Sequence, residues 1–179
     1  EYWLLAFKDF KGDQKFKEAF SEKIKSINDI YERGESYAFV GNFGIGKTYA
    51  ACCLLKKAII SDYSAKYYNM SDIITKVLNK NDPDTLKELT EIDFLVIDEF
   101  SKRFIFASEK SEQIFGQTME QILRSRFQNK MPTVICSNNE DIDEVLLAQN
   151  SSDFAKAFES LRRKHMTVYY ILGNDFRKK

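Results

Sequence analysis

The sequence predicts an α/β fold in which a parallel β-sheet carries helices on both faces. Short apolar runs alternate along the chain with longer segments whose apolar residues recur at helical spacing, as in repeated strand–helix–strand units. A glycine-rich loop of phosphate-binding type, residues 41–48, follows the first of these runs. Two acids, Asp98 and Glu99, follow the run 94–97, whose unbroken apolar character is typical of a strand buried on both faces.

Composition limits the function classes. The chain has 179 residues, of which 44% are apolar and 30% are charged, and its formal net charge is zero. This size predicts one domain with a sizeable core. A generally basic surface is excluded, so any contact with nucleic acid must be local. No apolar run approaches the ~20 residues of a membrane span. We expect no membrane partner.

Cysteine usage and the start of the chain add two expectations. Cys52, Cys53 and Cys136 fall in predicted core elements without metal-ligand spacing. They are therefore expected to be reduced, buried thiols of a cytoplasmic protein. The chain shows no signal peptide. It lacks an initial methionine, so we expect an N-terminal segment to be missing.

The first half of the chain is predicted to open with a helix over 14–32, which Arg33-Gly34-Glu35 ends. A strand at 37–41 leads into the phosphate-binding loop, and a helix runs from that loop to about Ser61. A second strand, 66–69, precedes another helix. Apolar residues at helical spacing support the helix over 14–32 and the helix after the strand 66–69. They are Phe16, Phe20, Ile24, Ile27 and Tyr31 in the first, and Met70, Ile73, Ile74, Val77 and Leu78 in the second.

The second half repeats this alternation. Pro83 suits the first turn of a short helix that reaches Leu89. The third strand follows, and then a helix over 109–128 with Ile114, Phe115, Met119, Ile122 and Leu123 facing inward. The remaining elements are a strand at 133–137, a helix at 152–163 and a strand at 167–172.

The loop predicts a site for a nucleotide, ATP, with Mg²⁺. Gly41-Asn42-Phe43-Gly44-Ile45-Gly46-Lys47-Thr48 matches G-x-x-x-x-G-K-[ST] between a strand and a helix. In that context backbone N–H groups and the helix dipole attract phosphate. Lys47 is expected to reach the β- and γ-phosphates and Thr48 to place its hydroxyl on Mg²⁺. Tyr49 continues the predicted nucleotide site.

The two acids after the third strand lie at the strand end where open parallel sheets bind ligands. Asp98 is predicted to hold Mg²⁺ through water, and Glu99 to orient and polarise the attacking water. A role limited to capping the next turn is the alternative. Asn138, at the tip of the fourth strand, is predicted to hydrogen-bond the γ-phosphate or its water; turn formation is the alternative.

For several basic residues the sequence allows both a functional and a structural interpretation. Lys76 and Lys80 lie opposite the apolar stripe of the helix that begins at Met70, and they either contact a nucleic-acid backbone or form a solvated face. Arg124 and Arg126 suit the dipole at the end of their helix or serve a function. His165, the only histidine, is expected on the surface or in packing.

Together these motifs resemble the AAA+ (ASCE) type of P-loop NTPase, and more narrowly the bacterial and phage helicase loaders of the DnaC/DnaI type, with the transposon ATPase IstB as close kin. The resemblance covers about residues 14–177. It rests on residues 44–48, 70–74, 92–100, Arg126-Phe127, 132–138 and Gly173-Asn174-Asp175-Phe176-Arg177.

The resemblance implies a three-layer fold. Its central five-stranded parallel sheet has the order 5-1-4-3-2, with helices on both faces and a reduced or absent lid. Residues 1–179 are expected to form a single AAA+ domain. They are too few to include the N-terminal helicase-binding region that loaders carry as well.

The resemblance also implies an ATPase that is slow, is stimulated by assembly or DNA, and helps place a hexameric replicative helicase on single-stranded DNA. It further implies self-association in which each ATP site is completed by an arginine from the next protomer. Arg162 is the first candidate for this arginine and Arg163 the second. Arg177 resembles the terminal arginine that senses nucleotide. The helix that begins at Met70 is associated with DNA in loaders.

Two other functions stay open. An IstB-like transposition helper would act on duplex DNA, against which the zero net charge argues mildly. A nucleotide-gated protein-binding module would turn ATP over little, although the presence of Lys47, Asp98 and Glu99 argues against loss of hydrolysis.

Overall fold

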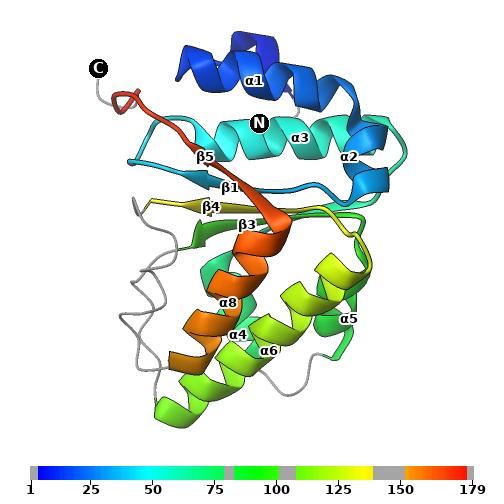
Figure 1. The fold of residues 1–179 in the computed structure, drawn as a ribbon, viewed down its shortest axis with the longest axis vertical. Coiled ribbons are helices and arrows are strands. Elements are labelled where there is room, and N and C mark those ends of the chain that lie inside the picture. Colours follow the sequence, from blue (N-terminus) through cyan, green and yellow to red (C-terminus); the bar gives the residue numbers. More distant parts are fainter. Residues whose placement is uncertain (1–3, 79–82, 101–107, 139–151, 177–179) are drawn as a thin grey trace.

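Five parallel strands form one sheet in the order β2-β3-β4-β1-β5 (Figure 1). The computed structural model describes residues 4–78, 83–100, 108–138 and 152–176. The order is the predicted 5-1-4-3-2 arrangement, so the sequence interpretation of the fold is confirmed. The strands are β1 Ser36–Val40, β2 Ala65–Asn69, β3 Phe94–Phe100, β4 Thr133–Ser137 and β5 Met166–Tyr170.

Helices cover both faces of the sheet and complete the three layers (Figure 1). One face carries the 3-10 turn η2 Phe7–Asp9 and the helices α1 Gln14–Lys25, α2 Ile27–Arg33 and α3 Lys47–Ile60. The other face carries α4 Met70–Leu78, α5 Pro83–Glu91, α6 Glu109–Gln128 and α8 Ser152–His165.

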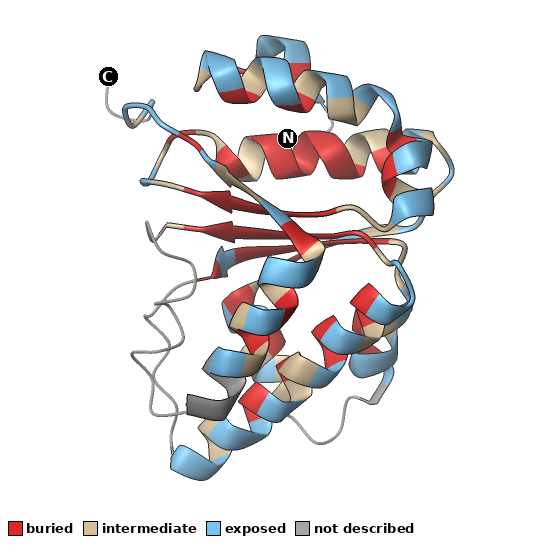
Figure 2. Cartoon of the chain, in the orientation of Figure 1, coloured by how far each residue is buried: buried red, intermediate tan, exposed pale blue. Residues whose placement is uncertain are grey.

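The core divides between the two faces because successive strand residues point in opposite directions. In β1, Tyr37 and Phe39 pack under α3, whereas Ala38 and Val40 pack on the α6 and α8 side. Every residue of β1 and β4 is buried, as Figure 2 shows for the middle of the sheet. The strands that lead to the phosphate-binding loop and to Asn138 are therefore held on both sides.

Several boundaries differ from the prediction, among them those of the first helix and of the last strand. The helix expected over 14–32 is broken at Ser26, whose φ of −105° and ψ of 62° are not helical, and becomes α1 and α2. β5 ends at Tyr170, two residues earlier than expected, although Ile171 still donates its N–H to the carbonyl of Val40 at 2.8 Å. In the described segment after β5, residues 171–176, there is no helix.

Two phenylalanines of the segment before α1, to which the sequence assigned no element, belong to the core. Phe7 and Phe10 are buried and stack on each other with ring centroids 5.4 Å apart. Their rings join an aromatic cluster with Phe16, Phe20 and Phe39 under the sheet. Aromatic rings bury large areas, so this cluster fixes the N-terminal segment beside β1 and α3.

Arg126 has a structural role, although it differs from the helix-dipole interaction that the sequence suggested. Its side chain is 0% exposed. The guanidinium donates to the carbonyls of Leu89, Ile92, Asp93 and Pro132 and to the Thr133 hydroxyl, over 2.8–3.3 Å. Burial lowers the pKa of Arg126 to about 9, so the side chain is still charged at neutral pH. It joins the end of α5, the start of β3 and the start of β4.

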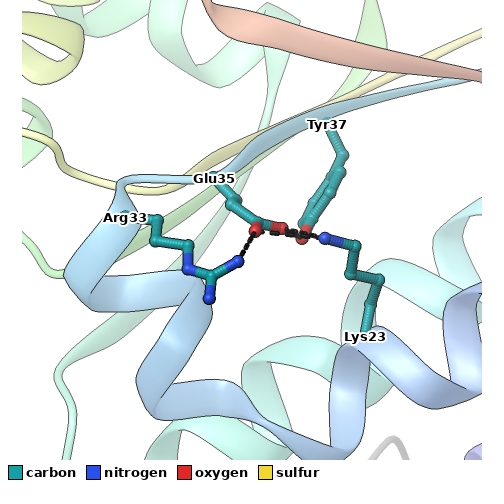
Figure 3. A network of polar contacts seen from close by, with 4 residues as sticks. All are labelled: Lys23, Arg33, Glu35 and Tyr37. Carbon is teal, nitrogen blue, oxygen red and sulfur yellow. Dashed lines mark hydrogen bonds and ion pairs between the residues drawn. The ribbon is translucent and has the colours of Figure 1, made fainter.

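A polar network joins α1 to the start of β1 (Figure 3). Glu35 accepts hydrogen bonds from Lys23 at 2.8 Å and from the Tyr37 hydroxyl at 2.6 Å, and Arg33 lies 3.8 Å away. Burial acts to raise the pKa of Glu35, but these donors outweigh it and hold the pKa below its ordinary value. The network lies at the amino end of β1, opposite the strand end that leads into the loop.

Two smaller expectations are met. The ring of His165 stacks on Phe127 with centroids 5.0 Å apart, which is the predicted packing role. Cys52, Cys53 and Cys136 form no disulfides and are buried, as predicted, and burial raises the pKa of the first two thiols to about 11 and about 12.

Within the described residues, no helix has the length and apolar character of a membrane span.

Candidate nucleotide-binding site

The loop at 41–46 wraps the start of α3 in a conformation that its glycines permit. Gly46 has a φ of 101°, and a Cβ there would lie 2.6 Å from the ring of Phe10. Gly41 has a φ of 148°, and a Cβ there would lie 2.3 Å from the carbonyl oxygen of Ile171. No side chain caps the N-terminus of α3 at Gly46. The first N–H groups of the helix are thus left for an anion.

Lys47 is the first residue of α3 and is 6% exposed. Its ammonium donates to the carbonyls of Gly41, at 2.8 Å, and Asn42, at 2.6 Å. The charge therefore lies inside the curve of the loop, where backbone dipoles hold it. A phosphate that enters the loop meets this ammonium together with the helix N-terminus.

Asp98 faces Thr48 across the site. Its carboxylate accepts a hydrogen bond from the Thr48 hydroxyl at 2.6 Å and from the Tyr67 hydroxyl at 2.8 Å, both on Oδ2. The backbone N–H of Glu99 donates to Oδ1 at 2.7 Å. Asp98 is 5% exposed, so three donors hold a buried carboxylate in one orientation.

A β-bulge places the two acids. Ile97 pairs with Ile135 and Phe100 with Ser137, so three steps along β3 match two along β4. Glu99 takes a left-handed backbone with a φ of 57°, which costs a non-glycine residue roughly 1–3 kcal/mol. Asp98 and Glu99, although adjacent in a strand, both line the cavity at the phosphate-binding loop. Strain of this kind is concentrated at functional sites.

A cavity of about 340 Å³ brings the predicted catalytic groups together. Lys47, Thr48, Asp98, Glu99 and Asn138 line it, with Phe43, Gly44 and Gly46 from the loop. Asn138 is half-buried and directly follows β4, and β4 pairs with both β1 and β3. Three separate segments therefore converge on one hollow at the carboxyl ends of the strands, where the fold class binds its ligands.

The donor set fits Mg²⁺. Thr48 and Asp98 offer oxygen ligands, which this ion prefers, and Thr48 directs its only hydrogen to Asp98, leaving its oxygen lone pairs for a cation. In the parts of the chain that are described, no group of three or more His, Cys, Asp or Glu is placed to hold a metal alone. Mg²⁺ commonly takes few protein ligands and completes its shell with phosphate and water.

Other predicted loop residues lie outside the cavity. The side chain of Ile45 is 1% exposed and packs into the core, so only its backbone can face phosphate. Asn42 lies in a neighbouring cavity of about 330 Å³ with residues 170–173. Tyr49 directs its hydroxyl to the carbonyl of Ala6 at 2.8 Å, and its ring lies beside that of Phe10. A nucleotide contact by the Tyr49 side chain stays a prediction.

Arg162, Arg163 and Lys76 do not line this cavity. Arg162 is half-buried and Arg163 is exposed in the last turn of α8, where Arg163 pairs with Glu159 at 2.5 Å. Lys76 lies over the ring of Tyr68, 5.9 Å from its centroid, and its ammonium reaches the Thr85 hydroxyl at 3.3 Å. A DNA phosphate would have to compete for that ammonium. Arg177 and Lys80 lie outside the described residues.

Sequence reasoning missed two features of the site. The Tyr67 hydroxyl reaches Asp98 from β2. Tyr67 stands two residues before Asn69, which pairs with Asp98, so the alternation of side chains along β2 could have indicated this contact once the register was known. The segment after β5 also contacts two distant parts of the chain: Asp13 accepts the N–H of Leu172 at 3.0 Å, and Phe176 donates its N–H to the carbonyl of Gly44, in the loop, at 3.2 Å. No local pattern predicts that second contact, since it joins residues far apart in sequence.

The fold and the loop define an ATP-binding protein of the P-loop AAA+ class. The chain belongs to the family of IstB-like ATP binding proteins, whose pattern matches residues 6–179. A comparison with curated proteins found no match.

Solved structures show the same fold at low identity. A DnaI structure has a TM-score of 0.78 and 14% identity, with 96% of this chain and 93% of that chain covered. A DnaC helicase loader has a TM-score of 0.73 and 18% identity, with 96% and 98% covered. AMPPCP-bound DnaA from Aquifex aeolicus has a TM-score of 0.68 and 15% identity, with 96% of this chain and 51% of that chain covered. These similarities confirm the fold expected from the loader resemblance.

Proposed function

We propose that this protein is a slow ATPase that uses bound ATP to control loading of a hexameric replicative helicase onto single-stranded DNA. The observation that carries the ATPase part is the convergence of Lys47, Thr48, Asp98, Glu99 and Asn138 on one cavity. The full-length similarity to a structure described as the DnaC helicase loader supports the second part.

Each group has a role that its position supports. Lys47 exchanges its loop carbonyls for the β- and γ-phosphates, and the first N–H groups of α3 hold the same phosphates. Mg²⁺, held between Thr48 and Asp98, supplies charge neutralisation when bound. Glu99 orients and polarises the attacking water, and Asn138 hydrogen-bonds the γ-phosphate or that water. Hydrolysis needs little beyond this positioning and charge.

Glu99→Gln tests the water-activating role. The variant keeps the size of the side chain but cannot accept a proton, so ATP turnover is expected to fall by about 10²-fold or more. ATP affinity should stay close to that of the wild type, because Glu99 is not placed to hold phosphate. Phosphate release measures turnover and titration measures affinity. Unchanged turnover would remove Glu99 from this role.

The site is completed in this proposal by a second protomer. The last turn of α8 carries four basic residues, Arg162 to His165, outside the chain's own cavity. Arg162 from the neighbour stabilises charge on the transferring phosphoryl group, with Arg163 as the second choice. Comparing turnover in Arg162→Ala and Arg163→Ala at matched ATP affinity decides between them. Arg177, which lies outside the described residues, senses the nucleotide in this proposal.

The proposed partners are a hexameric helicase and single-stranded DNA in the bacterial or phage-infected cytoplasm. Lys76 and Lys80 remain the candidate DNA contacts on α4 and just beyond it. Lysine–phosphate contacts release counterions, so this binding should weaken steeply with salt. Residues 1–179 act in this proposal as a single AAA+ domain.

The family match favours one second candidate, a transposition helper ATPase of the IstB type that acts on duplex DNA. A nucleotide-gated protein-binding module with little turnover is the remaining alternative. The three functions share the ATP site but differ in nucleic-acid substrate and assembly.

One experiment separates them. Labelled single-stranded and duplex DNA are titrated with and without a non-hydrolysable ATP analogue, while light scattering records the size of the assembly. ATP-dependent preference for single strands with small oligomers is the expected result. Filaments on duplex DNA would replace the loader proposal by the transposition helper. No DNA binding in either state would leave the protein-binding module.

A further inference from the structure

We propose that Tyr67 is a positioning residue of the ATP site, which holds the Asp98 carboxylate in the orientation that Mg²⁺ needs. This inference rests on the proposed function, since it assigns a further residue to the same site. It starts from the hydrogen bond between the Tyr67 hydroxyl and Asp98 Oδ2 at 2.8 Å.

The sheet register brings the two residues together. Asn69 of β2 pairs with Asp98 of β3, and Tyr67 pairs with Val96, so these side chains share the face of the sheet that carries α3. Tyr68, between them, points to the opposite face and packs in the other half of the core. Tyr67 therefore approaches Asp98 from the side, along the edge strand, while Thr48 approaches it from α3.

The hydrogen-bond inventory gives the direction of each bond. A phenol has one hydrogen, and two acceptors lie near it: Asp98 Oδ2 at 2.8 Å and Asn69 Oδ1 at 3.0 Å. The charged carboxylate is the stronger and nearer acceptor, so it takes the proton. The Asn69 amide then presents its NH₂ group to the phenol oxygen, an orientation obtained by exchanging its oxygen and nitrogen. Asn69 thereby holds the hydroxyl that holds Asp98.

This arrangement matters because Asp98 needs support that does not come from Thr48. The Thr48 oxygen is a predicted ligand of the ion, so its hydrogen bond to Asp98 changes when the nucleotide and the ion enter. Tyr67 and the N–H of Glu99 are the two donors among the described contacts of Asp98 that the ion does not use. Removal of such an outer partner typically weakens metal binding by about 10–100-fold.

The test measures nucleotide affinity rather than turnover. A fluorescent non-hydrolysable ATP analogue is titrated into wild type and Tyr67→Phe, once with MgCl₂ and once with EDTA. The ratio of the two affinities is the Mg²⁺ enhancement. We expect Tyr67→Phe to lower this enhancement about tenfold while the affinity in EDTA stays within about twofold of the wild type.

Tyr68→Phe is the matched control. It removes the same hydroxyl from the adjacent residue, but that hydroxyl bonds Glu88 at 2.7 Å on the opposite face. Its Mg²⁺ enhancement should equal that of the wild type. In an Asp98→Asn background, Tyr67→Phe should cause little further loss, because both changes act through the same carboxylate.

Three results would overturn the inference. They are an unchanged Mg²⁺ enhancement in Tyr67→Phe, an equal loss of affinity with and without Mg²⁺, and full additivity with Asp98→Asn. Failure of the proposed function would look different: the wild type itself would bind no analogue, or would bind it with no response to Mg²⁺. The two failures are therefore distinguished by the wild-type titration alone.

Discussion

Arg126→Met is expected to lower the free energy of unfolding by roughly 4 kcal/mol, because methionine leaves buried carbonyls without donors. All five N–H groups of Arg126 are matched by the five acceptors that its side chain reaches. Of these acceptors, the carbonyl of Pro132 keeps a partner, the N–H of Leu95 at 3.1 Å. The Thr133 hydroxyl keeps its bond to the carbonyl of Met131 at 3.2 Å. The other acceptors would each cost about 1–3 kcal/mol if buried and unmatched.

The loss would be a large part of the stability of the domain, since such domains are stable by only about 5–15 kcal/mol. A decrease of roughly 8–16 °C in the melting temperature follows for a chain of this size. Urea unfolding followed by circular dichroism measures the change. A free energy within about 1 kcal/mol of the wild type would contradict the structural role of Arg126.

Arg124→Met is the control for this experiment. It makes the same substitution in the same helix, but the Arg124 side chain is half-exposed and pairs with Glu120 at 2.6 Å. Exposed ion pairs contribute about 0–1 kcal/mol, so this variant should unfold close to the wild type. The difference between the two variants isolates the effect of burial.

Lys47→Ala is expected to weaken ATP binding by roughly 100-fold or more. The ammonium is held by the carbonyls of Gly41 and Asn42 at the position where the phosphates enter. Loss of its charge-assisted hydrogen bonds to phosphate removes about 3 kcal/mol, which corresponds to that factor. Titration with the non-hydrolysable analogue measures the affinity, and an undiminished affinity would disprove the assignment of the loop.

Lys57→Ala is the control for Lys47→Ala. It removes a lysine from the last turn of the same helix, about 15 Å from the loop at the rise of an α-helix. Its ATP affinity should match that of the wild type. Melting curves of both variants without nucleotide separate a loss of binding from a loss of folding, since Lys47 is itself buried.

The sequence by itself determined the fold class and the groups that line the phosphate cavity, whereas the strand order was implied by the resemblance to helicase loaders. The eight residues 41–48 carry their own chemistry, because glycine conformations, a helix start and a lysine are local properties of the chain. The position of Asp98 at a strand end is also a local property, because four apolar residues directly before it form a buried strand. Hydrophobic periodicity placed the helices, although it did not show the break at Ser26.

Only the tertiary structure decided the contacts between segments that are far apart in sequence. The five acceptors of Arg126 come from the 89–93 and 132–133 segments, and Tyr67 meets Asp98 across two strands. Such contacts depend on strand register and on helix packing, which a single sequence pattern does not contain. The bulge that turns both Asp98 and Glu99 into the cavity likewise arises from the pairing of β3 with β4, since neither strand specifies it alone.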